Sequence, residues 1–129
     1  MISFVEKPHK VVFLIYARKA KRRKKRMDLV VEELKIKLPE EFGFIEVQAI
    51  KDKYINYIEK NKIKSIVFDL EDTTFIDSSG IGFLLGRYRQ IQKYQGSVTV
   101  IHVSKNVAKL LRMSGLYSLM KIEEKEELL

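Results

Sequence analysis

The chain has 129 residues, of which 46% are hydrophobic and 33% are charged, and this composition is typical of a single globular domain. It contains no cysteine, which excludes disulfides, thiol catalysis and cysteine metal sites. The absence of cysteine also fits a reducing cytoplasm, where we expect the protein to act. Only His9 and His102 offer imidazole groups, so we predict neither a metal site nor a cofactor.

The positive charge is concentrated at the N-terminal end. The net charge is +8, and residues 1–26 hold 10 of the 25 Lys/Arg and 1 of the 17 Asp/Glu. Residues 27–129 therefore hold 15 basic and 16 acidic side chains. We predict a basic extension over residues 1–26 and one domain over residues 27–129. Because the domain itself is nearly neutral, the overall charge is poor support for a nucleic-acid function.

Residues 18–26 form an unbroken basic run apart from Ala20. Like charges repel one another, so we predict a solvated arm or a short exposed helix. Contact with nucleic acid or an anionic membrane is an alternative, although no aromatic residue in the run could stack on bases. A further hypothesis is that translation starts at Met27. In that case the codons of Arg22-Arg23 would be a ribosome-binding sequence just upstream of the true start. The apolar run over residues 11–17 is too short to span a membrane.

The hydrophobic pattern alternates between strands and helices. It predicts strands over residues 11–17, 28–31, 34–38, 63–70, 97–103 and 119–122, with a loop over residues 40–44. It predicts helices over residues 46–60, from residue 78 to about residue 94, and after an N-cap at Ser104 as far as Gly115. This alternation predicts an α/β fold with a mainly parallel central sheet of four to five strands and three to four helices.

Asp77-Ser78-Ser79-Gly80-Ile81-Gly82 lies where a strand gives way to a helix, and functional sites of parallel sheets lie at such strand ends. A nucleophile elbow needs glycine two residues before its serine, and neither serine has one. His102 falls within a predicted strand, where a structural role is the expected one. The glycines at 80, 82 and 86 fit neither a dinucleotide loop nor a Walker A loop. We therefore predict that the protein is not an enzyme.

Two roles for this motif remain open from the residues alone. Asp77 or Ser78 can cap the helix by accepting hydrogen bonds from free N–H groups, and Gly80 and Gly82 can pack its first turn against the sheet. A serine hydroxyl here can also accept a phosphate, which the positive end of the helix would tolerate and Asp77 would repel. Ser78 is the expected cap, and its exposed hydroxyl could also accept a phosphate. Farther along this helix, Arg87, Arg89, Gln90 and Lys93 are predicted to face solvent.

Residues 75–91 closely resemble the bacterial anti-sigma factor antagonists of the STAS domain class, and most of all those of the sporulation factor sigma-F. Residues 112–117 resemble the signature of the same group at the end of its third helix. The similarity is strong over residues 58–122 and weaker from Met27 onward. Residues 1–26 have no counterpart in it.

The resemblance implies a regulatory switch. Unphosphorylated antagonists bind an anti-sigma factor that is also a serine kinase, and the sigma factor is released. The kinase phosphorylates the serine that Ser78 matches, which ends binding, and a separate serine phosphatase reverses the reaction. Asp77, Ser79, Gly80 and Gly82 match the frame of that serine, and the resemblance implies that they help to bind the partner. The alternative is a STAS protein-binding module in another partner-switching pathway, such as a stress response.

The loop before the first predicted helix departs from the family pattern of Gly-Glu-Leu-Asp. Glu41 matches its glutamate, Phe42 its leucine, and Gly43 stands where its aspartate belongs. The resemblance implies that this loop lies near the acceptor serine and helps to bind the kinase. Glu41 and Gly43 are therefore predicted partner-binding positions.

Overall fold

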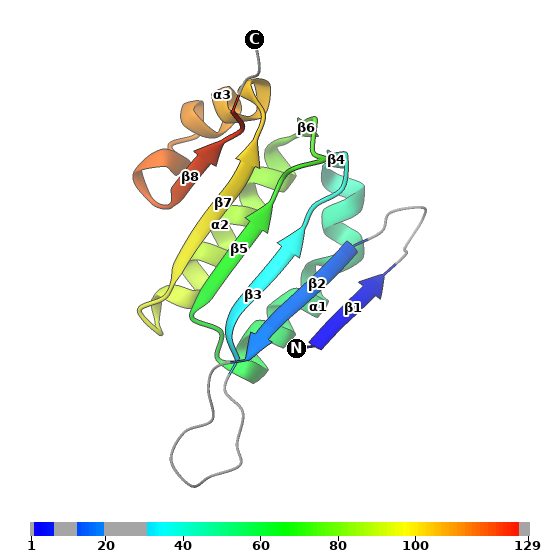
Figure 1. Cartoon of the computed structure of the whole chain (residues 1–129), viewed down its shortest axis with the longest axis vertical. Helices are drawn as coiled ribbons and strands as arrows, with labels where there is room; N and C mark the ends of the chain where they lie inside the picture. The colour runs from blue at the N-terminus through cyan, green and yellow to red at the C-terminus, as the bar shows by residue number, and fades with distance from the viewer. Residues whose placement is uncertain (1, 7–12, 20–30, 127–129) are drawn as a thin grey trace, which may run out of the picture.

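The computed structural model describes residues 2–6, 13–19 and 31–126, with side chains described from residue 33 onward. Its main feature is a six-stranded sheet in which β3, β5, β7 and β8 are parallel and β1 and β2 are antiparallel (Figure 1). In spatial order the strands are β1 (Ile2–Glu6), β2 (Phe13–Lys19), β3 (Val31–Lys37), β5 (Ser65–Asp69), β7 (Ser97–Val103) and β8 (Lys121–Glu124).

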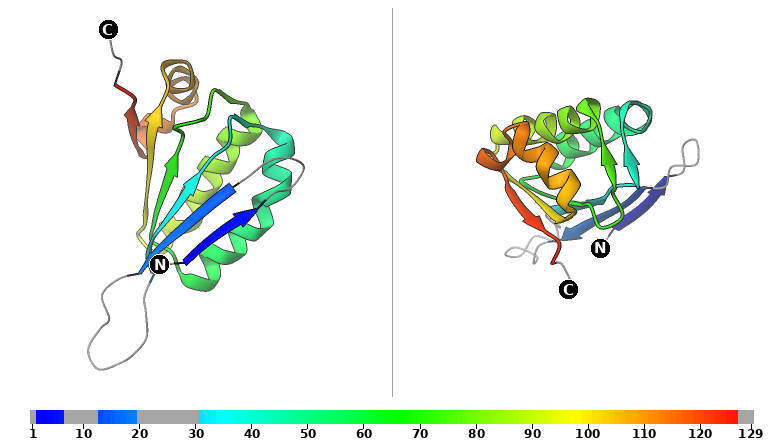
Figure 2. Two further views of the ribbon diagram at one scale, coloured as in Figure 1. Left: turned by 45° about the vertical axis from the view of Figure 1, so that its right-hand side comes forward. Right: turned by 90° about the horizontal axis from the view of Figure 1, so that it is seen from above.

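Two long helices lie side by side on one face of this sheet (Figure 2). They are α1 (Phe44–Asn61) and α2 (Ser78–Gln92). After β7 the chain forms α3 (Lys105–Met113) and a 3₁₀ turn, η2 (Leu116–Ser118), before it returns as β8. At the carboxyl ends of β3 and β5, two short parallel strands, β4 (Glu41–Phe42) and β6 (Phe75–Ile76), lead into α1 and α2. The starts of both long helices therefore lie at the same end of the sheet.

The core lies between the sheet and α1 and α2. Strand residues alternate between buried and half-buried, as in Glu33 to Lys37, because successive side chains point to opposite faces of the sheet. The helices bury residues at spacings of three and four, which is the period of one helix face. The buried side chains include Leu34, Ile36, Ile66, Phe68, Val98 and Val100 from the sheet, and Val47, Ile50, Tyr54, Ile58, Phe83, Leu84 and Ile91 from the helices.

The predicted α/β fold with a mainly parallel sheet is confirmed, and β2 overlaps the strand predicted over residues 11–17. The sheet is larger than predicted because β1, which was not predicted, adds a strand at its edge. The predicted strands over residues 28–31 and 34–38 are, in the described part, the single strand β3, and the predicted loop over residues 40–44 contains β4. Ser104 caps α3, with its Oγ 3.3 Å from the Val107 nitrogen, and Gly115 has a φ of 81°, both as predicted.

The N-terminal extension is described only in part. Arg18 and Lys19 of the predicted basic arm belong to β2, which pairs with β3. Residues 20–30, which include the rest of the arm and the boundary at Met27, lie outside the described residues, so that boundary stays a prediction. Within the described part of the chain, no helix is long and apolar enough to cross a bilayer.

One carboxylate links the C-terminal halves of α1 and α2. Glu59 on α1 lies 2.7 Å from the Lys93 ammonium and accepts hydrogen bonds from the Gln90 amide and the Tyr94 hydroxyl, each at 3.0 Å. These contacts, chiefly that with Lys93, lower the pKa of Glu59 from its usual 4.5 to about 2. The Glu59 carboxylate thus stabilises the packing of the two helices when it is ionised.

We predict that Glu59→Gln lowers the urea midpoint of unfolding at pH 7. The folded pKa lies below the unfolded value, so the contribution of Glu59 is complete above about pH 4.5 and is lost as the pH falls towards 2. The difference between wild type and variant should shrink over that interval. The control is Glu126→Gln, at an exposed side chain that has no hydrogen bond or ion pair within the described residues. A Glu59→Gln difference that is the same at pH 7 and pH 2.5 would contradict the assignment.

Candidate functional site

The carboxylate of Asp77 joins the N-terminal ends of α1 and α2. Its Oδ1 accepts a hydrogen bond from the Gly80 nitrogen at 3.0 Å, which makes Asp77 the N-cap of α2. Its Oδ2 accepts a hydrogen bond from the nitrogen of Phe44, the first residue of α1, at 3.1 Å and 33 positions away in the chain. One negative charge thereby lies at the positive ends of two helix dipoles.

Gly43 makes room for this shared cap. A side chain on Gly43 would begin with a Cβ only 2.7 Å from Asp77 Oδ2. The Gly43 nitrogen instead donates to Glu46 Oε1 at 2.8 Å, which is one half of a capping box. Gly43 has no side chain that could accept from the first turn of α1, and Asp77 instead accepts from the Phe44 nitrogen in that turn. The glycine in place of the family aspartate is therefore matched by a cap from the other helix.

Gly80 brings the first turn of α2 against the two short strands. It is buried, and a Cβ there would clash with the Phe42 carbonyl oxygen and lie 2.6 Å from Ile76 Cγ1. The predicted packing role of Gly80 is confirmed, and its part in partner binding stays a prediction. The same prediction for Gly82 is wrong, because Gly82 is exposed and no atom lies within 4 Å of its virtual Cβ.

Ser78 is the first residue of α2 and is exposed. The prediction that Ser78 caps the helix is wrong, because the carboxylate of the preceding residue, Asp77, already accepts from the first turn. The Ser78 side chain has no hydrogen bond to the described residues, so its hydroxyl is available at the surface. Ser79 is half-buried and faces the cleft between α1 and α2, while Glu41 is exposed on β4.

Three large apolar side chains are exposed around this end of the molecule, and we name them the apical patch: Phe44, Ile45 and Phe75. They are 59%, 63% and 50% exposed, respectively. Phe44 and Ile45 begin α1 beside Asp77, and Phe75 lies in β6 two residues before it. Sequence reasoning missed this patch. The sequence did contain a signal for it: Phe44 and Ile45 are large and apolar, but they lie before Val47, where the helical spacing of core residues begins.

His102 is held by an acidic side chain of the neighbouring strand. Its Nδ1 lies 2.9 Å from Asp69 Oδ1, and its φ of 58° marks an irregularity in β7. Burial raises the pKa of Asp69, but hydrogen bonds from His102 and the Glu71 nitrogen outweigh it, so the net shift is downward. The predicted structural role of His102 in its strand agrees with this contact.

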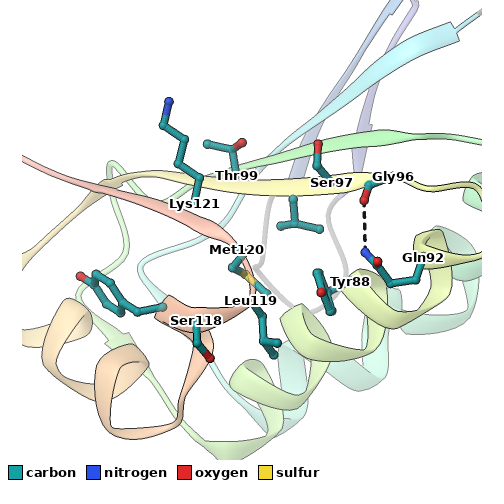
Figure 3. A pocket seen from close by; sticks show the side chains of 11 residues that line it. Tyr88, Gln92, Gly96, Ser97, Thr99, Ser118, Leu119, Met120 and Lys121 are labelled. Carbon is teal, nitrogen blue, oxygen red and sulfur yellow. Dashed lines mark hydrogen bonds between the residues drawn. The ribbon is translucent and has the colours of Figure 1, made fainter.

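A hollow of about 470 Å³ lies beside the C-terminal half of α2, between β7 and the segment around η2 (Figure 3). Figure 3 shows Tyr88 and Leu119 on the helix side of the strands, whereas Thr99 and Lys121 project from the other side. The polar groups that line the hollow therefore do not converge on one point. No cluster of potential metal ligands occurs among the described residues.

Comparisons with known proteins agree on the class. The sequence profile of the STAS domain matches residues 21–128. The chain belongs to the STAS domain family, and the motif at residues 77–82 lies inside the matched segment.

One curated relative is the anti-sigma F factor antagonist of Paenibacillus polymyxa, which is 41% identical over 69 residues. That match spans 54% of this chain and only 59% of the relative. The structure of the anti-sigma factor antagonist SpoIIAA in its unphosphorylated form has a TM-score of 0.65 at 31% identity, covering 70% of this chain and 79% of that one. The structure of the Bacillus cell fate determinant SpoIIAA in its phosphorylated form has a TM-score of 0.59 at 30% identity, covering 70% and 82%.

The two glycines of the motif give a matched pair of predictions. Gly80→Ala should destabilise the fold by about 1–3 kcal/mol, because the added methyl meets fixed backbone. Gly82→Ala should be neutral or stabilising by up to about 1 kcal/mol, since alanine favours a helix interior and the space is open. Urea unfolding of both variants measures the difference, and an equal effect at the two positions would contradict the packing described.

Proposed function

We propose that this protein is an anti-sigma factor antagonist, which binds an anti-sigma factor with serine kinase activity, releases a sigma factor, and is switched off by phosphorylation at Ser78. The observation that supports this most is the exposed, uncommitted hydroxyl of Ser78 beside the apical patch. We further propose that a serine phosphatase resets the switch, that the protein itself is not an enzyme, and that it acts in the cytoplasm during sporulation.

The position of Ser78 suits a kinase substrate. Its side chain is exposed at the end of a helix and is not held by a hydrogen bond to the described residues. Because Asp77 caps α2 instead, a kinase could use the Ser78 hydroxyl without breaking the helix start. Ser79 is half-buried in the adjoining cleft and is the poorer acceptor of the two.

The surroundings of Ser78 suggest how a phosphate would end binding. Phosphorylation adds about 1.5 to 2 negative charges near neutral pH. The Gly80 and Phe44 N–H groups, which could otherwise hold an anion, already donate to Asp77. Those two N–H groups are therefore not available to the phosphate, which would add its charge to the surface that Phe44, Ile45 and Phe75 share. A partner that covers this patch would have to desolvate the phosphate dianion, which strongly disfavours the complex.

The relatives support the proposal through their names. The Paenibacillus polymyxa relative is an anti-sigma F factor antagonist, and SpoIIAA has been solved in both unphosphorylated and phosphorylated forms. The motif and the two helix starts described above lie in the part of this chain that the family profile covers.

The acceptor is tested by incubating wild-type protein, Ser78→Ala and Ser79→Ala with a serine-kinase anti-sigma factor of the same organism and ATP. Intact-mass spectrometry should find one phosphate on wild type and on Ser79→Ala, and none on Ser78→Ala, because the Ser78 hydroxyl is exposed and that of Ser79 is half-buried. Undiminished phosphate on Ser78→Ala would refute the site.

The apical patch is tested by Ile45→Ser. This change should weaken binding to the same anti-sigma factor by about 10-fold or more, as expected for loss of an interface anchor. The matched control is Leu119→Ser, at an apolar side chain that is 41% exposed beside the hollow of Figure 3. Calorimetry should find nearly wild-type affinity for the control. Equal losses at both positions would remove the patch from the interface.

A further inference from the structure

A second feature of the same end of the molecule is a cleft of about 290 Å³ between α1 and α2. It begins at Phe44 of the apical patch and Ser79 of the motif, and it continues along the helices. Its lining is basic: the two charged side chains are Lys51 from α1 and Arg87 from α2, and no acidic residue takes part. Gly82 contributes no side chain, which leaves the cleft open on the α2 side.

Arg87 is the unusual member of this lining. The sequence predicts that it faces solvent, but only 8% of it is exposed, so that prediction is wrong. Its guanidinium carbon lies 4.9 Å from the centre of the Phe83 ring, one turn earlier on α2. This stacking explains the burial, because the planar guanidinium itself covers the aromatic ring, and Arg87 still lines the cleft.

The guanidinium is held on one side only. Arg87 Nε donates to Gln90 Oε1 at 2.9 Å, and the Gln90 amide donates to the Ile55 carbonyl oxygen at 2.9 Å on α1. Arg87 has no ion pair with any residue that the structure describes, and burial lowers its pKa. Lys51 has no ion pair within the described residues either.

An arginine buried without a carboxylate is costly, because desolvation of the charge is not offset by a partner. The guanidinium nevertheless stays buried, because the Phe83 ring and Gln90 fix it in one orientation. Its terminal N–H groups form a planar fork that suits the two oxygens of a carboxylate. An incoming acidic side chain needs a fixed guanidinium, a second cation and an opening beside the apical patch. The cleft provides all three.

We propose that this cleft binds a carboxylate, from an aspartate or glutamate of the anti-sigma partner, with Arg87 as its main ligand and Lys51 as a second cation. The inference rests on the proposed function, since the partner is the protein that covers the apical patch. The cleft shares Phe44 with that patch, so one partner surface reaches both. The contact would add partner specificity to an otherwise apolar interface, because a partner without the acidic residue would bury Arg87 unpaired.

The test measures binding of a purified serine-kinase anti-sigma factor of the same organism to the full chain by calorimetry. Lys51→Glu should weaken binding by about 10-fold or more, since it places a like charge opposite the incoming carboxylate. Lys53→Glu makes the same change in net charge two residues along α1, outside the cleft lining, and should stay within about twofold of wild type. Arg87→Lys keeps the charge but loses the fork and should also weaken binding by about 10-fold.

Urea unfolding checks that each variant is folded, and Lys51→Glu, at an exposed site, keeps the test valid if Arg87→Lys is unstable. A partner variant with one interface aspartate or glutamate changed to lysine should restore binding to Lys51→Glu. Unchanged affinity of both cleft variants, or an equal loss in Lys53→Glu, would overturn the inference. If wild type itself does not bind, the proposed function fails. If wild type binds and the cleft variants bind as tightly, only the inference about the cleft fails.

Discussion

The hydrogen bonds of the Asp77 carboxylate to Gly80 and Phe44 are the contact on which the rest of the site depends. They bring together the starts of two helices that are far apart in the sequence. Gly43 must lack a side chain to admit the carboxylate, and Gly80 must lack one to let α2 approach the Phe42 carbonyl. As a result, Phe44 and Ile45 emerge from the first turn of α1 beside Ser78, and an apolar surface and an exposed hydroxyl share one end of the domain.

This arrangement separates structural stability from regulation. Asp77 supplies the caps, each worth about 1 kcal/mol, so Ser78 is not needed to hold its helix. A modification of Ser78 would then change the charge of the surface while the fold underneath keeps its contacts. The cleft behind the patch follows the same logic, because Arg87 is fixed by Phe83 and Gln90 within this chain and leaves its charge for a partner. Under this account the switch acts on the interface, where a dianion is costly to bury, and leaves the core unchanged.

Local patterns in the sequence were sufficient for the α/β fold, for the cap at Ser104 and for the left-handed Gly115. They could not decide between Asp77 and Ser78 as the cap, because both residue types cap helices well. The second hydrogen bond of Asp77 was beyond prediction, since it reaches a residue 33 positions away. Helical spacing placed Arg87 on the solvent side, but its stacking on Phe83 depends on how α1 and α2 pack. Gly80 and Gly82 look alike in sequence, and only their neighbours in space distinguish them.

The central claim is that Asp77 holds both helix starts independently of Ser78, so that phosphorylation changes the surface and not the fold. The most direct measurement is amide hydrogen exchange at Phe44 and Gly80 in protein phosphorylated at Ser78, compared with unmodified protein. The account predicts the same protection at both amides, because their acceptor is the Asp77 carboxylate in either state. Faster exchange at both amides after phosphorylation would mean that the phosphate displaces Asp77, and it would contradict the account.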